Sequence, residues 1–227
     1  LLPEKGLVVA GDVVIGADSH TCTYGALGAF STGVGSTDMA AGMASGESWF
    51  KVPPAIKVNL TGKLSPYVAA KDIILEVLRI LSVKGGVGKV VEYGGEGVKT
   101  LSVPERATIT NMGAELGATT SVFPSDDITK AFLKAQGREE DWVELKADED
   151  AVYDEVININ LSELAPMAAC PHMPDRVKSV TEIGKIKVDQ VCIGSCTNSS
   201  LLDMMKVAYI LKGKPVHPVV SLSIAPG

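Results

Sequence analysis

The chain has 227 residues, of which 46% are hydrophobic and 21% charged, so it has room for one or two domains around a sizeable apolar core. Its formal net charge of -6 argues against a nucleic-acid partner, because phosphates call for clustered Lys and Arg. No apolar run reaches the roughly 18 residues of a membrane helix, and no basic segment followed by an apolar one marks a secretion signal. The four cysteines lack the spacing of a disulfide framework, which favours a reducing cytoplasm.

The first predicted strand, from Val8 to Ile15, leads into the polar sequence Gly16-Ala17-Asp18-Ser19-His20-Thr21. Small residues fill the stretch from Gly25 to Gly46, which predicts close packing of backbones. The glycines in this stretch do not follow the order of the dinucleotide fingerprint, so they favour packing over a nucleotide site.

A second unit begins after the break at Pro53-Pro54, where alternating side chains predict a strand from Ile56 to Leu60. Ser65-Pro66 predicts the start of a helix that ends at Gly85-Gly86. Its apolar side chains recur at helical spacing and indicate a core-facing surface: Ile73, Ile74, Val77, Leu78 and Leu81.

The next predicted helix, from Thr108 to Gly117, places Asn111 and Glu115 four residues apart and therefore on one face. On a solvent-exposed helix such a pair gives no evidence of a functional site. Because the flanking residues are small or apolar, we expect this face to be covered, and a covered carboxylate needs a partner.

The segments that follow carry no predicted chemistry. They are a helix at 128–136 capped by residues 124–127, an acidic linker at 139–150 and a strand at 156–161. Cys170 and His172 lie two residues apart, but no further Cys or His is near enough in the sequence to complete a metal site.

The last unit joins a predicted strand, Val188 to Ile193, to a helix through Gly194-Ser195-Cys196-Thr197-Asn198-Ser199-Ser200, where Ser199 or Ser200 is expected to be the cap. Backbone amides at a helix start stabilise negative charge, so Cys196 is expected to favour the thiolate that ligates metals. A buried thiol in a tight turn is the alternative. Cys192 and Cys196 by themselves do not hold a cluster.

Both ends of the chain lead us to expect a fragment of a longer protein. Leu1 is not a methionine, and the chain stops just after a strand-like run from Val216 to Ile224, where a doubly wound fold would enter its next helix. Part of any active site is therefore expected outside these residues.

Three segments together resemble signatures of the aconitase superfamily of iron-sulfur hydro-lyases. They are Asp18 to Thr21, Asn111 to Pro124 and Ile193 to Ser199, in the order and at about the spacing of that family. The resemblance covers nearly the whole chain. It implies an α/β fold of three domains around a cleft, completed by a fourth, swivelling domain.

Within that fold, the resemblance implies that residues 1–54 end domain 1, residues 55–168 form domain 2 and residues 169–227 begin domain 3. It also implies a [4Fe-4S] cluster held by three cysteines, with one iron left free for the substrate. Cys196 matches the first ligand, and the other two are expected beyond residue 227. The remaining cysteines match no ligand position: Cys22, Cys170 and Cys192.

The resemblance also implies roles for the other motif residues. His20 would handle the proton at the departing hydroxyl with Glu115 as its partner, and Asp18 would pair with a histidine upstream of this chain. Ser19 and Asn111, together with Asp18 and His20, would bind substrate or cluster-bound oxygen. These residue types fit the chemistry, because dehydration next to a carboxylate needs a base, a proton donor and a Lewis acid.

The resemblance is divided on the substrate. Residues 16–53 look more like large subunits of 3-isopropylmalate dehydratase and homoaconitase, enzymes of amino-acid biosynthesis. The segment from Lys71 onward looks more like aconitase, and this longer match favours isomerisation of citrate to isocitrate through cis-aconitate in the tricarboxylic acid cycle.

The expected partners are a small di- or tricarboxylate and, in the dehydratase alternative, a separate small subunit with the swivelling domain. A non-enzymatic ligand- or RNA-binding domain and a nucleotide-binding enzyme are the alternatives of other classes.

Overall fold

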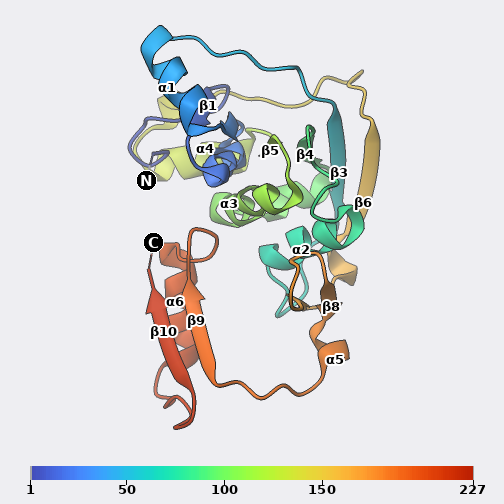
Figure 1. Cartoon of the computed structure of the whole chain (residues 1–227), viewed down its shortest axis with the longest axis vertical. Coiled ribbons are helices and arrows are strands. Elements are labelled where there is room, and N and C mark those ends of the chain that lie inside the picture. The colour runs from blue at the N-terminus through green and yellow to red at the C-terminus, as the bar shows by residue number, and fades with distance from the viewer. Residues whose placement is uncertain (1, 227) are drawn as a thin grey trace.

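The computed structural model describes residues 2–226 as a series of α/β units (Figure 1). Among these residues, three sheets are parallel and a fourth is a short antiparallel pair. The predicted α/β class is therefore confirmed. Over the same residues, no helix combines the length and the apolar character that crossing a membrane requires.

The first unit contains a parallel pair of strands. Its elements are β1 (Val13–Gly16), the 3-10 helix η1 (Ser19–Leu27), β2 (Phe30–Gly33) and α1 (Ser36–Ser45). The strand predicted from Val8 begins later. Val9 N donates a hydrogen bond to Asp12 Oδ2 (2.9 Å) and Gly11 has a φ of 87°, so the chain turns before β1.

The central sheet has the strand order β5-β4-β3-β6, with every neighbouring pair parallel. Its strands are β3 (Ala55–Thr61), β4 (Val90–Gly94), β5 (Thr120–Val122) and β6 (Glu155–Asn160). In β3, the fully buried Ile56, Val58 and Leu60 alternate with partly exposed residues, as the sequence predicts. One face of the sheet therefore belongs to the core, and the other is less covered.

Helix α2 (Ala70–Leu81) buries its predicted apolar face in that core. It begins later than Ser65-Pro66 predicts. Val68 N donates a hydrogen bond to Ser65 O (3.1 Å), so these residues form a turn instead of a first helical turn. Asp72 then accepts a hydrogen bond from Ala69 N (2.7 Å) and satisfies an amide at the true start of the helix.

Helix α3 (Val103–Asn111) begins earlier than the predicted Thr108. Ser102 caps it, and Glu105 Oε2 accepts a hydrogen bond from Ser102 N (2.9 Å) in a capping box. After Asn111 the chain tightens into the 3-10 helix η3 (Met112–Leu116). The predicted continuous helix at 108–117 is therefore two elements.

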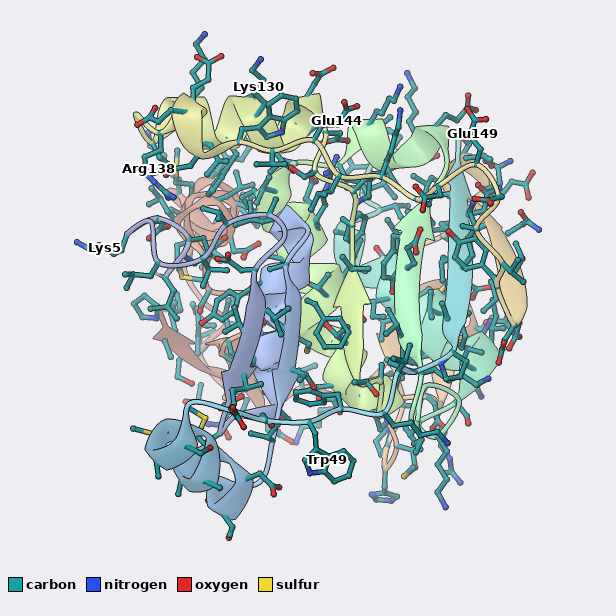
Figure 2. The ribbon with its side chains drawn as sticks, turned by 90° about the horizontal axis from the view of Figure 1, so that it is seen from above. Lys5, Trp49, Lys130, Arg138, Glu144 and Glu149 are labelled. Carbon is teal, nitrogen blue, oxygen red and sulfur yellow. The ribbon has the colours of Figure 1, made fainter. Side chains whose placement is uncertain are left out.

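Helix α4 (Asp127–Ala135) begins where the sequence predicts, with Asp126 as its N-cap. Arg106 of α3 is fully buried and donates hydrogen bonds to both Asp126 carboxylate oxygens (2.9 and 2.7 Å), so α3 and α4 are joined by a buried ion pair. The segment after α4 runs past the sheet to β6, with Glu144 and Glu149 exposed on it (Figure 2). Three short 3-10 helices complete this region: η2 (Glu96–Thr100), η4 (Glu139–Asp141) and η5 (Leu161–Glu163).

The last part of the chain begins with an antiparallel pair and ends with a parallel one. Its elements are β7 (Met167–Ala169), β8 (Val177–Ser179), α5 (Val180–Ile183), β9 (Gln190–Gly194), α6 (Leu201–Leu211) and β10 (Ser221–Ala225). Ser200 is the N-cap of α6, one of the two caps predicted. No residue in β9, α6 or β10 is buried.

The first unit and the central sheet are in close contact at Gly25. A Cβ at this position would lie 1.7 Å from Ser121 O of β5, and Phe123 N donates a hydrogen bond to Gly25 O (2.9 Å). Only glycine allows η1 to approach β5 this closely, as the run of small residues predicted.

Candidate active site

The three motif segments meet around the carboxyl end of α3. The polar loop 16–21 follows β1, Asn111 and Glu115 lie at the end of α3 and in η3, and Cys196 follows β9. Figure 1 shows α3 between the β1–β2 pair and the β9–β10 pair. Segments far apart in the sequence therefore lie side by side here.

His20 lies between two carboxylates. Its Nδ1 is 3.3 Å from Asp18 Oδ1, and its Nε2 is 3.8 Å from Glu115 Oε1. The His20 side chain is 30% exposed, and that of Glu115 is 42% exposed. The imidazole ring is thus oriented from both sides and still accessible to a small molecule.

Glu115 is less covered than the sequence predicts. Asn111 is 2% exposed, so the two side chains do not share one buried face. The cause is the 3-10 geometry of η3, in which residues turn by about 120° each and positions four apart no longer align. This turn directs the Glu115 carboxylate to His20 and leaves the Asn111 amide in the interior.

The Asn111 amide joins the three segments by hydrogen bonds. Its Nδ2 donates to Thr23 Oγ1 of η1 (2.9 Å), and its Oδ1 accepts from Thr197 Oγ1 (2.8 Å). Cys196 Sγ lies 3.9 Å from the same oxygen. In this arrangement the amide is occupied by protein partners, so Asn111 positions the loop that carries Cys196.

The loop with Asp18 and His20 is held by a side-chain to backbone hydrogen bond and by close packing against β2. Asp18 caps η1, because its Oδ1 accepts a hydrogen bond from His20 N (2.6 Å). Gly33 of β2 packs against the loop, where a Cβ would lie 2.6 Å from Asp18 O and 2.8 Å from the Cα of Ser19. Ser19 is exposed at this turn.

Cys196 is reached through a left-handed turn. Gly194 has a φ of 140° and Ser195 a φ of 89°, which turns the chain sharply away from the end of β9. Cys196 is exposed, so the alternative of a buried thiol is wrong. It precedes the cap of α6, Ser200, by four residues.

A second thiol lies behind the site. Cys22 is 2% exposed, and its Sγ donates to Thr110 O (3.2 Å). Burial raises the pKa of this thiol from 9.0 to about 11. Cys22 is therefore a neutral packing residue of η1, consistent with its lack of a match to a ligand position.

Sequence reasoning missed the two threonines that complete the site. Thr23 and Thr197 bond to Asn111 from segments that lie 88 and 86 residues away in the sequence. Their only signal in the sequence was position, since Thr197 lies inside the Ile193 to Ser199 motif and Thr23 follows the Asp18 to Thr21 motif by two residues. A hydroxyl in a polar loop does not reveal a partner so distant.

A complete iron-sulfur cluster does not fit the described residues alone. Within residues 2–226, no group of three or more His, Cys, Asp or Glu side chains is placed to hold a metal ion. Cys192 Sγ instead accepts a hydrogen bond from Ser223 Oγ (3.3 Å). Both Cys192 and Cys196 are exposed, and Cys196 is the one that lies within hydrogen-bond reach of Asn111, where the other motifs meet.

Comparison with known proteins places this sequence in a family. The profile of the aconitase family (aconitate hydratase) matches residues 1–185 and 176–227. The chain is 54% identical over 227 residues to the 3-isopropylmalate dehydratase large subunit of Clostridium botulinum (strain Eklund 17B / Type B), and 56% identical to that of Thermoanaerobacter sp. (strain X514). In both comparisons 100% of this chain covers 54% of the relative, so the chain spans about half the length of these relatives.

The names of these relatives favour the dehydratase alternative over the preference for citrate. The relatives match the segment from Lys71 onward as well as residues 16–53, so the longer match does not separate an aconitase from a dehydratase. The 3-isopropylmalate dehydratase alternative is the better supported of the two. The family profile matches the chain from end to end, and the three motifs meet at α3. The chain therefore belongs to the aconitase family.

Proposed function

We propose that this chain is part of the large subunit of a hydro-lyase that removes water from, and returns it to, a hydroxy dicarboxylate of the isopropylmalate type. The observation that carries the proposal is the meeting of His20 and Glu115, 3.8 Å apart, beside the loop of Cys196. The names of the similar proteins support the same substrate class. A separate small subunit, which the name of a large subunit implies for those relatives, would complete the cleft.

His20 and Glu115 are proposed as the proton-handling pair. Asp18 fixes the Nδ1 side of the ring, which leaves Nε2 on the Glu115 side for proton transfer. In dehydration the C–O bond of the substrate breaks, the departing hydroxyl takes a proton from this pair and leaves as water, and a base removes the proton from the neighbouring carbon. Imidazole suits the first of these steps because it gains and loses protons near neutral pH.

Cys196 is proposed as one of three ligands of a [4Fe-4S] cluster, with the other two supplied by residues outside this chain. Such a cluster would contribute a Lewis acid for the departing hydroxyl. Ser19 is exposed at the same turn as His20 and is proposed to bind the substrate, whereas Asn111 is proposed to hold the Cys196 loop in place. The division into domains at 54 and 168 is part of this proposal.

The test is to express the full-length large subunit with its small subunit, reconstitute it with iron and sulfide without oxygen, and follow the absorbance of the unsaturated product. We expect turnover of isopropylmalate and its dehydrated form, with citrate a poor substrate. Faster turnover of citrate than of isopropylmalate would reject the substrate class. Unchanged activity and iron content in a Cys196→Ser variant would reject the ligand assignment.

A further inference from the structure

An open cavity of about 570 Å³ lies beside the proposed proton-handling pair, a size in the range of small-molecule sites. Glu115 of η3 and Thr197 of the Cys196 loop line it on one side. Lys71 and Leu75, one turn apart on α2, line it on another. The cavity thus connects the proposed site to the first turn of α2.

Lys71 brings an unpaired positive charge to this cavity. Its side chain is exposed, and within residues 2–226 no carboxylate lies within ion-pair distance of it. Lys71 also lines a smaller neighbouring cleft that contains Glu105 and Asp203. These two carboxylates accept hydrogen bonds from Ser102 and Ser200 at the starts of α3 and α6, and neither forms an ion pair with Lys71 among the described residues.

The rest of the cavity wall is largely apolar. The buried core residues Leu75 and Met112 line the cavity, as do Met167, Ala168 and Ala169 of β7. Asp72 fixes this wall to α2, because its Oδ1 accepts a hydrogen bond from Met167 N (2.7 Å) while its Oδ2 accepts from Ala69 N (2.7 Å). The start of α2, which carries Lys71, and the β7 part of the wall are therefore tied together by one carboxylate.

We propose that Lys71 is a substrate-binding residue that pairs with a carboxylate of the hydroxy acid, while the apolar wall receives the branched hydrocarbon substituent. A cation next to an apolar surface complements a dicarboxylate with such a substituent, because the charge pairs with the carboxylate and the wall removes hydrocarbon from water. A ligand in this cavity also reaches Glu115, which belongs to both the cavity and the pair with His20. The inference rests on the proposed function for the identity of the acid.

The experiment uses the full-length large subunit with its small subunit and reconstituted cluster. Lys71→Met removes the charge and keeps most of the hydrocarbon stem, Lys71→Arg keeps the charge, and Lys84→Met is the matched control at an exposed lysine beyond the other end of α2. We expect Lys71→Met to raise KM for isopropylmalate by about 10- to 100-fold with kcat changed less than about threefold. Lys71→Arg should stay within a few-fold of the wild type.

Two outcomes overturn the subsite: a Lys71→Met variant that matches Lys84→Met in KM, or one that loses kcat with no change in KM. Direct calorimetric binding of isopropylmalate separates this inference from the proposed function. If the wild type binds the acid without turning it over and Lys71→Met abolishes binding, the subsite stands and the reaction assignment falls. If the wild type turns the acid over and Lys71→Met binds it normally, the subsite falls alone.

The apolar wall has its own test. Met167→Ala shortens the wall without touching the backbone amide that Asp72 holds. We expect it to reduce the ratio of kcat/KM for the isopropyl substrate over a methyl analogue by about three- to tenfold, the scale of one or two buried methylene groups. An unchanged ratio contradicts the placement of the substituent.

Discussion

The central sheet and the terminal β9–α6–β10 unit hold their halves of the proposed site in different ways. The central unit contains one large core in which residues such as Ile73, Leu78 and Ile109 are fully buried. In the terminal unit no residue of a strand or helix is buried, and Leu201 and Tyr209 are 78% and 84% exposed. Side-chain packing therefore fixes Glu115, whereas Cys196 depends on a few polar contacts.

Those contacts lie along α3. Thr197 Oγ1 donates to Asn111, Asn198 Nδ2 donates to Thr108 Oγ1 (3.4 Å), and Thr108 Oγ1 lies 3.3 Å from Thr197 O. Helix α3 thus presents the amide that positions the cysteine loop, and η3, which follows it directly, presents the carboxylate that orients His20. The comparison predicts that damage to the core spreads to the whole site, while damage to the polar contacts stays local.

The largest expected effect comes from Arg106, the buried cation of the central unit. Arg106→Met removes the guanidinium partner of Asp126 and the donors to the buried carbonyls of Leu101 and Val98, and a loss of this kind costs about 3 kcal/mol or more of the free energy of unfolding. Urea unfolding of the large subunit measures it. Arg79→Met, which breaks the more exposed pair with Glu76, is the control and should cost less than about 1 kcal/mol. Equal effects of the two substitutions would show that burial does not distinguish these pairs.

The second effect is catalytic and local. Glu115→Gln removes the charge that faces His20 Nε2 and should lower kcat of the intact enzyme by about 10²-fold, with little change in stability. Steady-state kinetics and thermal unfolding measure the two quantities. Glu149→Gln, on the exposed segment seen in Figure 2, is the matched control and should leave both unchanged. Near-normal turnover of Glu115→Gln would remove Glu115 from the proton-handling pair.

The third effect separates the two units directly. Asn111→Ala deletes the amide that joins Thr23 to Thr197, so amide hydrogen exchange at 195–199 should accelerate by about tenfold, while exchange at 56–60 stays slow. Asn59→Ala removes a comparable amide pair, with Asn158, on the exposed face of the central sheet. It should leave exchange at 195–199 unchanged. Faster exchange in both segments of Asn111→Ala would mean that the amide supports the core and not the loop alone.

Local patterns predicted the parts of this molecule that local physics decides. The alternation in β3, the apolar face of α2 and the Ser200 cap each depend on neighbours in the sequence. The exposure of Glu115 could not be predicted, because it depends on the change from α- to 3-10 geometry after Asn111. The bond between Asn111 and Thr197 joins residues 86 apart, and no periodicity reports such a contact.

The smallest expected effect tests whether the core behind the site is closed. The folded pKa of Cys22, about 11, lies above its ordinary value of 9.0, so the folded state keeps a proton that the unfolded chain releases. The stability from this thiol is complete below pH 9 and is lost as the pH rises through 11. Between pH 8 and pH 10 the wild type should lose about 1 kcal/mol more of the free energy of unfolding than Cys22→Ser, whose hydroxyl does not ionise in this range. Because buried tyrosines contribute equally to both proteins, urea unfolding at the two pH values isolates the thiol. A wild-type loss no larger than that of Cys22→Ser would mean that water reaches Cys22, and the packing that holds η1 against α3 would then be looser than its contacts indicate.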